Sequence, residues 1–116
     1  MSVENLVARG SSRPRENIKT EQFFRCLADN LRVRILLLLI HEGEKSTEAI
    51  AAELDSTDSI VRRHMALLSK NQLVTFQQRG LSLCYNLNMD IPVWKQKVLK
   101  HTYKGNKALL DEVQQD

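Results

Sequence analysis

The stretch 46–87, STEAIAAELDSTDSIVRRHMALLSKNQLVTFQQRGLSLCYNL, decides the fold of this chain. Its first part predicts a short helix that begins at Ser46 or Thr47. Three polar residues, 55–57, then predict a tight turn. A second helix is expected over 58–71, because apolar residues recur there at helical spacing. The order helix, turn, helix predicts a helix-turn-helix unit.

The second of these helices has two different faces. Thr57 is a suitable N-cap for it, and Val61, Met65 and Leu68 recur at i, i+4 and i+7, so they must pack against the first helix. The opposite face is small or polar, which lets a helix enter the major groove of DNA. Candidate DNA-binding residues on and beside this face are Thr57, Asp58, Ser59, Arg62, Arg63 and His64.

Two strands are expected after the second helix, over 73–77 and 81–87. Gly80 supplies the positive φ that a tight hairpin requires. The tip of this hairpin adds Gln78 and Arg79 to the candidate DNA-binding residues, and Arg79 is placed to reach a minor groove or a phosphate. The whole pattern predicts a mainly α fold with a small β-hairpin, a winged helix-turn-helix.

The residues before this unit predict a tail and two helices. Residues 1–19 are polar and carry Arg9, Arg13 and Arg15, so a flexible basic tail is expected. Thr20 is a candidate N-cap for a first helix, and Asn30 for a second helix over 31–41. The second of these is apolar around most of its circumference, which predicts a place at the centre of the core.

A last helix is expected after Pro92, which suits a first helical turn, with Asp90 as its N-cap. Gly105 should weaken or bend this helix. Its apolar surface is too large for a small core to cover, which predicts a partner chain, most simply a second copy. The expected organisation is a tail over 1–19, a winged helix-turn-helix domain over 20–90 and a dimerisation helix over 91–116.

Composition excludes several other classes of protein. The 116 residues suffice for one domain, with 42% hydrophobic residues and a net charge of +3. There is no glycine-rich phosphate loop and no set of nucleophile, base and orienting residue, so an enzyme is not expected. No signal peptide or membrane-spanning segment is recognised in the sequence, which predicts a cytoplasmic protein without a membrane partner.

Three segments resemble the ArsR/SmtB family of repressors. Residues 24–36, FRCLADNLRVRIL, resemble the motif F-x-x-L-A-D-x-x-R-x-x-I-L, and residues 61–68, VRRHMALL, are similar to the recognition helix I/V-S-R-H-L-x-x-L. Residues 87–94, LNMDIPVW, resemble L-S-x-x-I-P-x-W of the arsenic-responsive branch. The resemblance covers 21–103. It implies a homodimer formed by the first and last helices, which binds double-stranded operator DNA as a repressor and leaves it when an inducer binds.

The chain departs from this family at both of its metal sites. The arsenic-responsive motif E-L-C-V-C-D-L has thiols where this chain has Ser46 and Glu48, which are hard oxygen ligands. A second family motif, D-x-H-x10-H-x2-E/H, is represented here only by Asp90. We therefore expect no metal and no cofactor, and the sequence names no effector.

Several alternatives stay open from the sequence. Cys26 and Cys84 could form a thiol-based redox switch if their sulfur atoms lie close enough to bridge. Otherwise they are expected to be two small, semi-buried residues that pack as apolar side chains. A winged-helix module that binds proteins instead of DNA is a further possibility. Arg62 fits a bidentate contact to guanine, Asp58 fits either a contact to cytosine or an ion pair with Arg62, and Arg63 fits a DNA contact or a structural ion pair.

Overall fold

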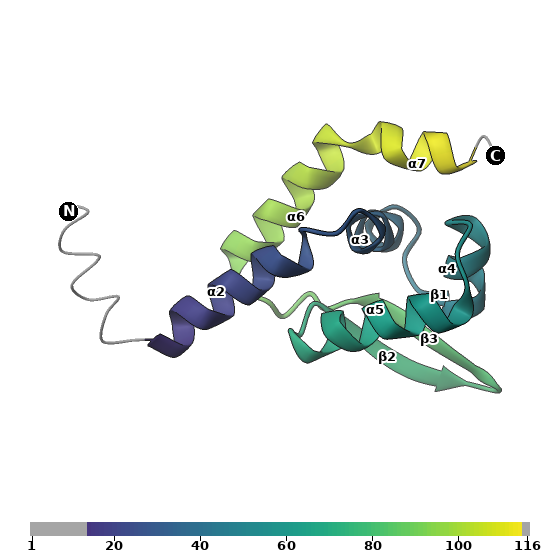
Figure 1. Cartoon of the computed structure of the whole chain (residues 1–116), viewed down its shortest axis with the longest axis horizontal. Coiled ribbons are helices and arrows are strands. Elements are labelled where there is room, and N and C mark those ends of the chain that lie inside the picture. Colours follow the sequence, from purple (N-terminus) through teal and green to yellow (C-terminus); the bar gives the residue numbers. More distant parts are fainter. Residues whose placement is uncertain (1–13, 115–116) are drawn as a thin grey trace.

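The computed structural model describes residues 14–114, with side chains described over 19–110 (Figure 1). Most of the predicted basic tail, including Arg9 and Arg13, lies outside the described residues. In chain order the elements are α2 (Pro14–Cys26), α3 (Asn30–Glu42), β1 (Lys45–Ser46), α4 (Thr47–Glu53), α5 (Asp58–Lys70), β2 (Val74–Arg79), β3 (Ser82–Leu87), α6 (Val93–Gly105) and α7 (Lys107–Gln114). The chain is mainly helical with a small antiparallel sheet, as predicted.

The beginnings of the first two helices differ from the prediction. α2 begins at Pro14 and not at Thr20, because proline fits a first helical turn, where its missing N–H group is not needed. The N-cap of α3 is Asp29 and not Asn30. Asp29 has extended backbone angles, and its Oδ1 accepts a hydrogen bond of 3.1 Å from the backbone N–H of Arg32.

α3 is the centre of the core, as its sequence predicted. Five consecutive residues, Ile35–Leu39, are each no more than 2% exposed. Neighbouring elements must therefore cover α3 on several sides, and α6, α7 and β3 all contact it. Gly43, with a φ of 82°, then ends the helix.

The helix-turn-helix unit is formed by α4 and α5, with the predicted caps. The Ser46 hydroxyl accepts from Ala49 N–H at 3.1 Å, and the Thr57 hydroxyl accepts from Ile60 N–H at 3.2 Å. The predicted inner face of α5 is confirmed, because Val61, Met65 and Leu68 are completely buried. α4 and α5 pack against each other, and α5 thereby turns its opposite face outward.

The wing is a sheet of three strands and not only the predicted hairpin. β2 and β3 pair antiparallel up to Arg79 opposite Ser82, and Gly80 has the predicted positive φ, 63°. β1 pairs with the other edge of β3 and places Ser46 opposite Cys84. β1 has only two residues, too few to show a pattern that sequence analysis could detect.

The last part of the chain forms two helices. The predicted N-cap Asp90 is wrong, because α6 begins only at Val93, after Pro92. α6 ends at Gly105, Asn106 is its C-cap, and α7 begins at Lys107. α6 runs beside α2, and α7 lies over α3 (Figure 1). Within residues 14–114, no helix is both long and apolar enough to cross a membrane.

The cap at Asp29 should stabilise the fold in a pH-dependent way. The Arg32 backbone N–H group holds the pKa of Asp29 below its ordinary value. A depressed pKa in the folded state contributes stability above the pKa of the unfolded chain, and this contribution is lost as pH falls through the folded-state pKa. Asp29→Ala should lower the free energy of unfolding by about 1 kcal/mol at pH 7.

Urea denaturation at a series of pH values measures this difference, which should shrink under acid conditions. Asp90→Ala is the matched control, since Asp90 is exposed and does not cap α6. Equal losses in the two variants, or a loss in Asp29→Ala that does not change with pH, would contradict the assigned cap.

Candidate nucleic-acid interface

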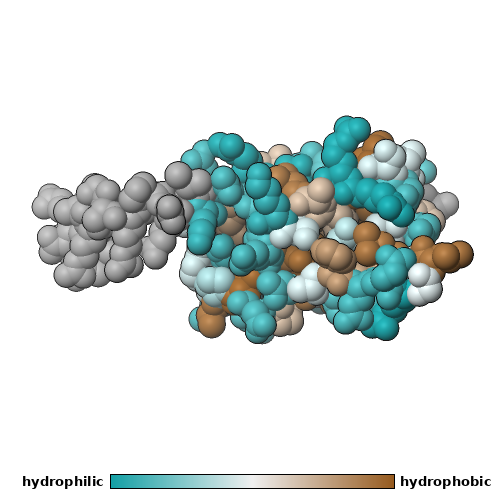
Figure 2. Space-filling model, turned by 90° about the horizontal axis from the view of Figure 1, so that it is seen from below, coloured by the Kyte–Doolittle hydropathy of each residue, from teal (hydrophilic) through white to brown (hydrophobic). Residues whose placement is uncertain are grey.

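The outer face of α5 forms a continuous exposed surface next to the hairpin. Ser59, Arg62, Arg63 and Ala66 are all exposed, in contrast to the buried inner face of the same helix. Figure 2 views the molecule from this side, which is mainly hydrophilic with hydrophobic patches between. A helix that is anchored on one face and polar on the other can enter a DNA groove without disturbing the core.

Asp58 and Arg62 are paired with each other at the start of α5. The Arg62 Nε donates to Asp58 Oδ2 at 2.6 Å, which confirms the i, i+4 pair among the alternatives for Asp58. The buried Thr47 hydroxyl, and after it Arg62, lower the pKa of the Asp58 carboxyl. The ion pair with Asp58 therefore orients Arg62 at the start of α5.

Arg63 is not the paired arginine of this helix. The sequence had left open that Arg63 forms a structural ion pair. Within the described part of the chain its side chain forms none, and Arg62 is the arginine that pairs with an acid. Ile60 was not among the predicted site residues, but it lies in the first turns of α5 and is 39% exposed. An exposed apolar side chain beside arginines suits the methyl group of thymine.

His64 is held by an arginine that sequence analysis did not assign to the site. The Arg32 Nη1 lies 3.1 Å from His64 Nδ1, and the same guanidinium donates to the backbone carbonyls of Arg25 and Cys26. Arg32 thus joins the end of α2, the start of α3 and the middle of α5. Its position in the F-x-x-L-A-D-x-x-R motif was the signal that could have indicated this role.

The wing tip is held against the start of the sheet by an ion pair. Arg79 donates from Nε and Nη2 to the two carboxylate oxygens of Glu44, at 2.6 and 3.1 Å. This bidentate pair lowers the pKa of Glu44 through the hydrogen bond from Arg79. The predicted site residue Gln78 instead donates to the Gly80 carbonyl at 3.1 Å and so stabilises the turn. Leu81, beside Gly80, is 99% exposed.

The two cysteines lie in different elements, at the end of α2 and in β3, and both are free thiols. Cys26 is 1% exposed, and burial raises its pKa, which opposes formation of a reactive thiolate. Among the residues that the structure describes, no three His, Cys, Asp or Glu side chains form a cluster suited to a metal ion. Neither observation adds support for a redox or metal centre.

Sequence comparison identifies curated relatives along most of the chain, although no family model matches it. The arsenical resistance operon repressor of Escherichia coli K12 is 32% identical over 83 residues, which are 72% of this chain and 71% of that protein. The arsenic resistance transcriptional regulator ArsR1 of Pseudomonas putida KT2440 is 29% identical over 96 residues, 83% of this chain and 75% of that protein.

Solved structures share the fold. A homodimeric winged helix-turn-helix DNA-binding domain from Mycobacterium bovis, described as a possible ArsR-family regulator, superimposes with a TM-score of 0.67. The superimposed residues are 86% of this chain and 85% of the Mycobacterium bovis domain, and the two sequences are 20% identical. The structural comparison confirms the predicted winged helix-turn-helix.

Proposed function

Because the chain belongs to the ArsR family of DNA-binding transcriptional repressors, we propose that it binds operator DNA as a homodimer, with α5 in the major groove and the β2–β3 hairpin beside it. The observation that carries this proposal is the division of α5 into a buried apolar face and an exposed face with Arg62 and Arg63. Thr57 caps the same helix at the end that should lie nearest a phosphate.

The surface formed by α2 and α6 supports the homodimer. Phe24, Val93 and Trp94 are 48%, 63% and 42% exposed, which leaves an aromatic and apolar surface open to water. The rings of Phe24 and Trp94 are 6.1 Å apart, so the surface is continuous between the two helices. A second copy, related by a two-fold axis, would cover it with the same residues.

The residues at the start of α4 support a repressor without a soft-metal site at that position. Ser46 already uses its hydroxyl as the N-cap of α4, and Glu48 is an exposed carboxylate in the first turn. Neither offers the thiolate that a soft metal ion prefers. The effector is therefore expected to differ from a thiolate-bound metal, and it should act elsewhere in the fold.

Arg62→Ala should weaken binding to the operator by about 1–3 kcal/mol, the range for a bidentate arginine–guanine contact. Fluorescence anisotropy with DNA from upstream of the protein's own gene, in the presence of unrelated competitor DNA, measures the change. Lys104→Ala, on the exposed side of α6, is the control and should leave affinity unchanged. Equal affinity of Arg62→Ala and the unchanged protein would refute the assignment of α5 to the major groove.

The wing contact should be visible in the salt dependence of binding. Arg79→Ala should reduce the slope of log K against log[salt] by about 1, because one phosphate contact is lost. Glu44→Gln should instead strengthen DNA binding, because Arg79 then forms its phosphate contact without first breaking an ion pair with Glu44. Lys104→Ala again serves as control. A slope that is the same in all four proteins would place Arg79 away from DNA.

The dimer surface can be tested separately from DNA binding. Phe24→Glu should weaken dimerisation about tenfold or more, because a two-fold axis brings two carboxylates into one apolar interface. Leu81→Glu introduces the same charge at an exposed apolar residue of the wing and should leave the dimer intact. Sedimentation velocity gives the mass, and circular dichroism checks that both variants are folded. A dimeric Phe24→Glu would exclude this surface.

A further inference from the structure

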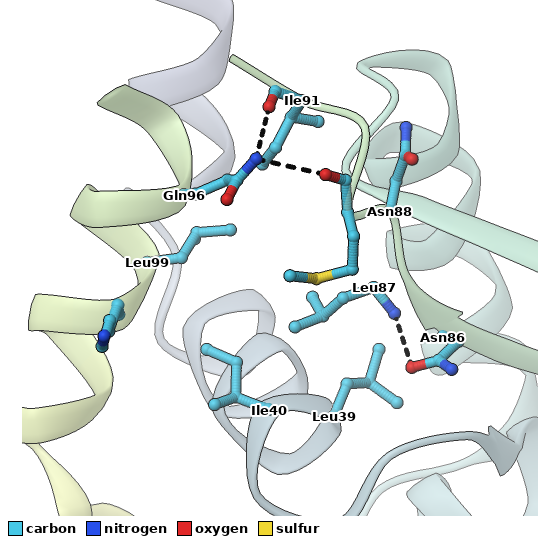
Figure 3. Close-up of a pocket in the computed structure, with 10 residues that line it drawn as sticks. Leu39, Ile40, Asn86, Leu87, Asn88, Ile91, Gln96 and Leu99 are labelled. Atoms are coloured by element: carbon cyan, nitrogen blue, oxygen red, sulfur yellow. Dashed lines mark hydrogen bonds between the residues drawn. The ribbon is translucent and has the colours of Figure 1, made fainter. Parts of the chain in front are cut away.

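A cavity of about 430 Å³ lies between α3, α6 and the linker that joins β3 to α6 (Figure 3). This volume falls within the range of small-molecule sites in proteins, about 300–1,000 Å³. Four apolar side chains from three different elements point toward its centre, namely Leu39, Ile40, Leu87 and Leu99 (Figure 3). The cavity is thus an apolar space within the described part of the fold, and it is separate from the outer face of α5.

Four of the ten residues that line this cavity are polar or charged, namely Asn86, Asn88, Gln96 and Lys100. Gln96 donates from Nε2 to the carbonyl oxygens of Met89 and Ile91, at 3.1 and 2.8 Å, and so holds the linker against α6. Lys100 is the one charged residue among those that line the cavity. It is exposed and, within the described residues, has no ion pair. Among the described residues, the lining therefore offers one cation that has no carboxylate partner.

We propose that this cavity binds a small molecule with an apolar body and a single carboxylate group. The apolar body would lie between Leu39, Leu87 and Leu99, and the carboxylate would meet the ammonium group of Lys100. The proposal follows from the volume, the apolar lining and the single unpaired cation. The lining has no thiol, imidazole or carboxylate, so it lacks the usual anionic and imidazole ligands of a transition-metal site.

The cavity has a direct connection to the end of the recognition helix. Asn88, which lines the cavity, donates from its side chain to the Gln72 carbonyl at 2.8 Å and from its backbone to the Leu73 carbonyl at 3.0 Å. Gln72 and Leu73 follow α5 almost at once, and Gln72 has a positive φ of 62°. A ligand that displaces the linker would therefore shift the end of α5 relative to α6.

This connection gives the ligand a regulatory role, which rests on the proposed function. In a homodimer formed through α2 and α6, the angle between α6 and α5 sets the spacing of the two recognition helices. Binding of two operator half-sites depends on that spacing. A carboxylate ligand in the cavity is thus expected to change operator affinity without touching DNA.

The ligand site is tested without DNA. The probe is octanoate, titrated below its micelle concentration into isotope-labelled protein and followed by NMR chemical shifts. Saturable shifts at Leu39, Leu87 and Leu99 are expected. Lys100→Glu should weaken octanoate binding about fivefold or more and should favour octyltrimethylammonium instead. Lys97→Glu, on the same helix but not in the cavity, is the matched control and should change neither.

A second variant tests the space instead of the charge. Met89 lines the cavity and is 68% exposed, so Met89→Trp should block the entrance while the core stays intact. Loss of octanoate binding by this folded variant is the expected result. The proposal is overturned if octanoate gives no saturable shifts, if Lys97→Glu weakens binding as much as Lys100→Glu, or if Met89→Trp still binds normally.

The coupling to DNA needs its own measurement. Octanoate should change the anisotropy-detected affinity for operator DNA in the unchanged protein and not in Met89→Trp. If octanoate binds by NMR and operator affinity is unaffected, the regulatory role is overturned and the ligand site stands. If the protein does not bind operator DNA at all, the proposed function fails, and the NMR titration still decides whether the cavity is a carboxylate site.

Discussion

The burial of α3 is the constraint on which the rest of the structure depends. Five apolar residues in succession, Ile35–Leu39, cannot be covered from one side of a helix, so elements from the second half of the chain have to surround it. β3, α6 and α7 supply that cover. The wing strand and the helix of the proposed dimer surface are consequently packed on one common helix, which fixes the position of the wing relative to α6 within a protomer.

Paired charges govern the proposed DNA surface as much as the arginines themselves do. Arg62 is paired with Asp58, and Arg79 with Glu44, so two of the three candidate arginines already have a carboxylate partner in the unbound protein. Phosphate or a base has to replace that partner, which reduces the net gain from non-specific contacts with the DNA backbone. Arg63, without an ion pair in the described residues, can contact phosphate without that exchange. The proposed surface should therefore bind most tightly to DNA in which a base contact with Arg62 compensates for the lost ion pair with Asp58.

The sequence predicted the parts of this structure that depend on local pattern, and it missed the parts that depend on distant contacts. The caps at Ser46 and Thr57, the inner face of α5 and the turn at Gly80 follow from spacing and side-chain chemistry within a few residues. Glu44 was missed because its partner Arg79 lies 35 residues away, and Arg32 because its contact with His64 spans 32. Asn30 and Asp90 were expected as caps on residue type alone, but the backbone places Asp29 and Pro92 at those helix starts.

α6 carries two surfaces with different requirements, which explains its mixed sequence. Trp94, toward α2, belongs to the surface proposed for a second copy, whereas Gln96, Leu99 and Lys100 form one wall of the cavity. Leu99 is buried in the core, the Tyr103 hydroxyl lies 2.8 Å from His41 of α3, and Trp94 packs edge-on against the buried ring of Phe23, so both sides of α6 also contribute to the fold of the protomer. In the proposed regulator, α6 would contact the partner protomer on one side and the ligand on the other, so that a ligand in the cavity would change the arrangement of the two protomers. No thiolate cluster is required for such a repressor to respond to a signal.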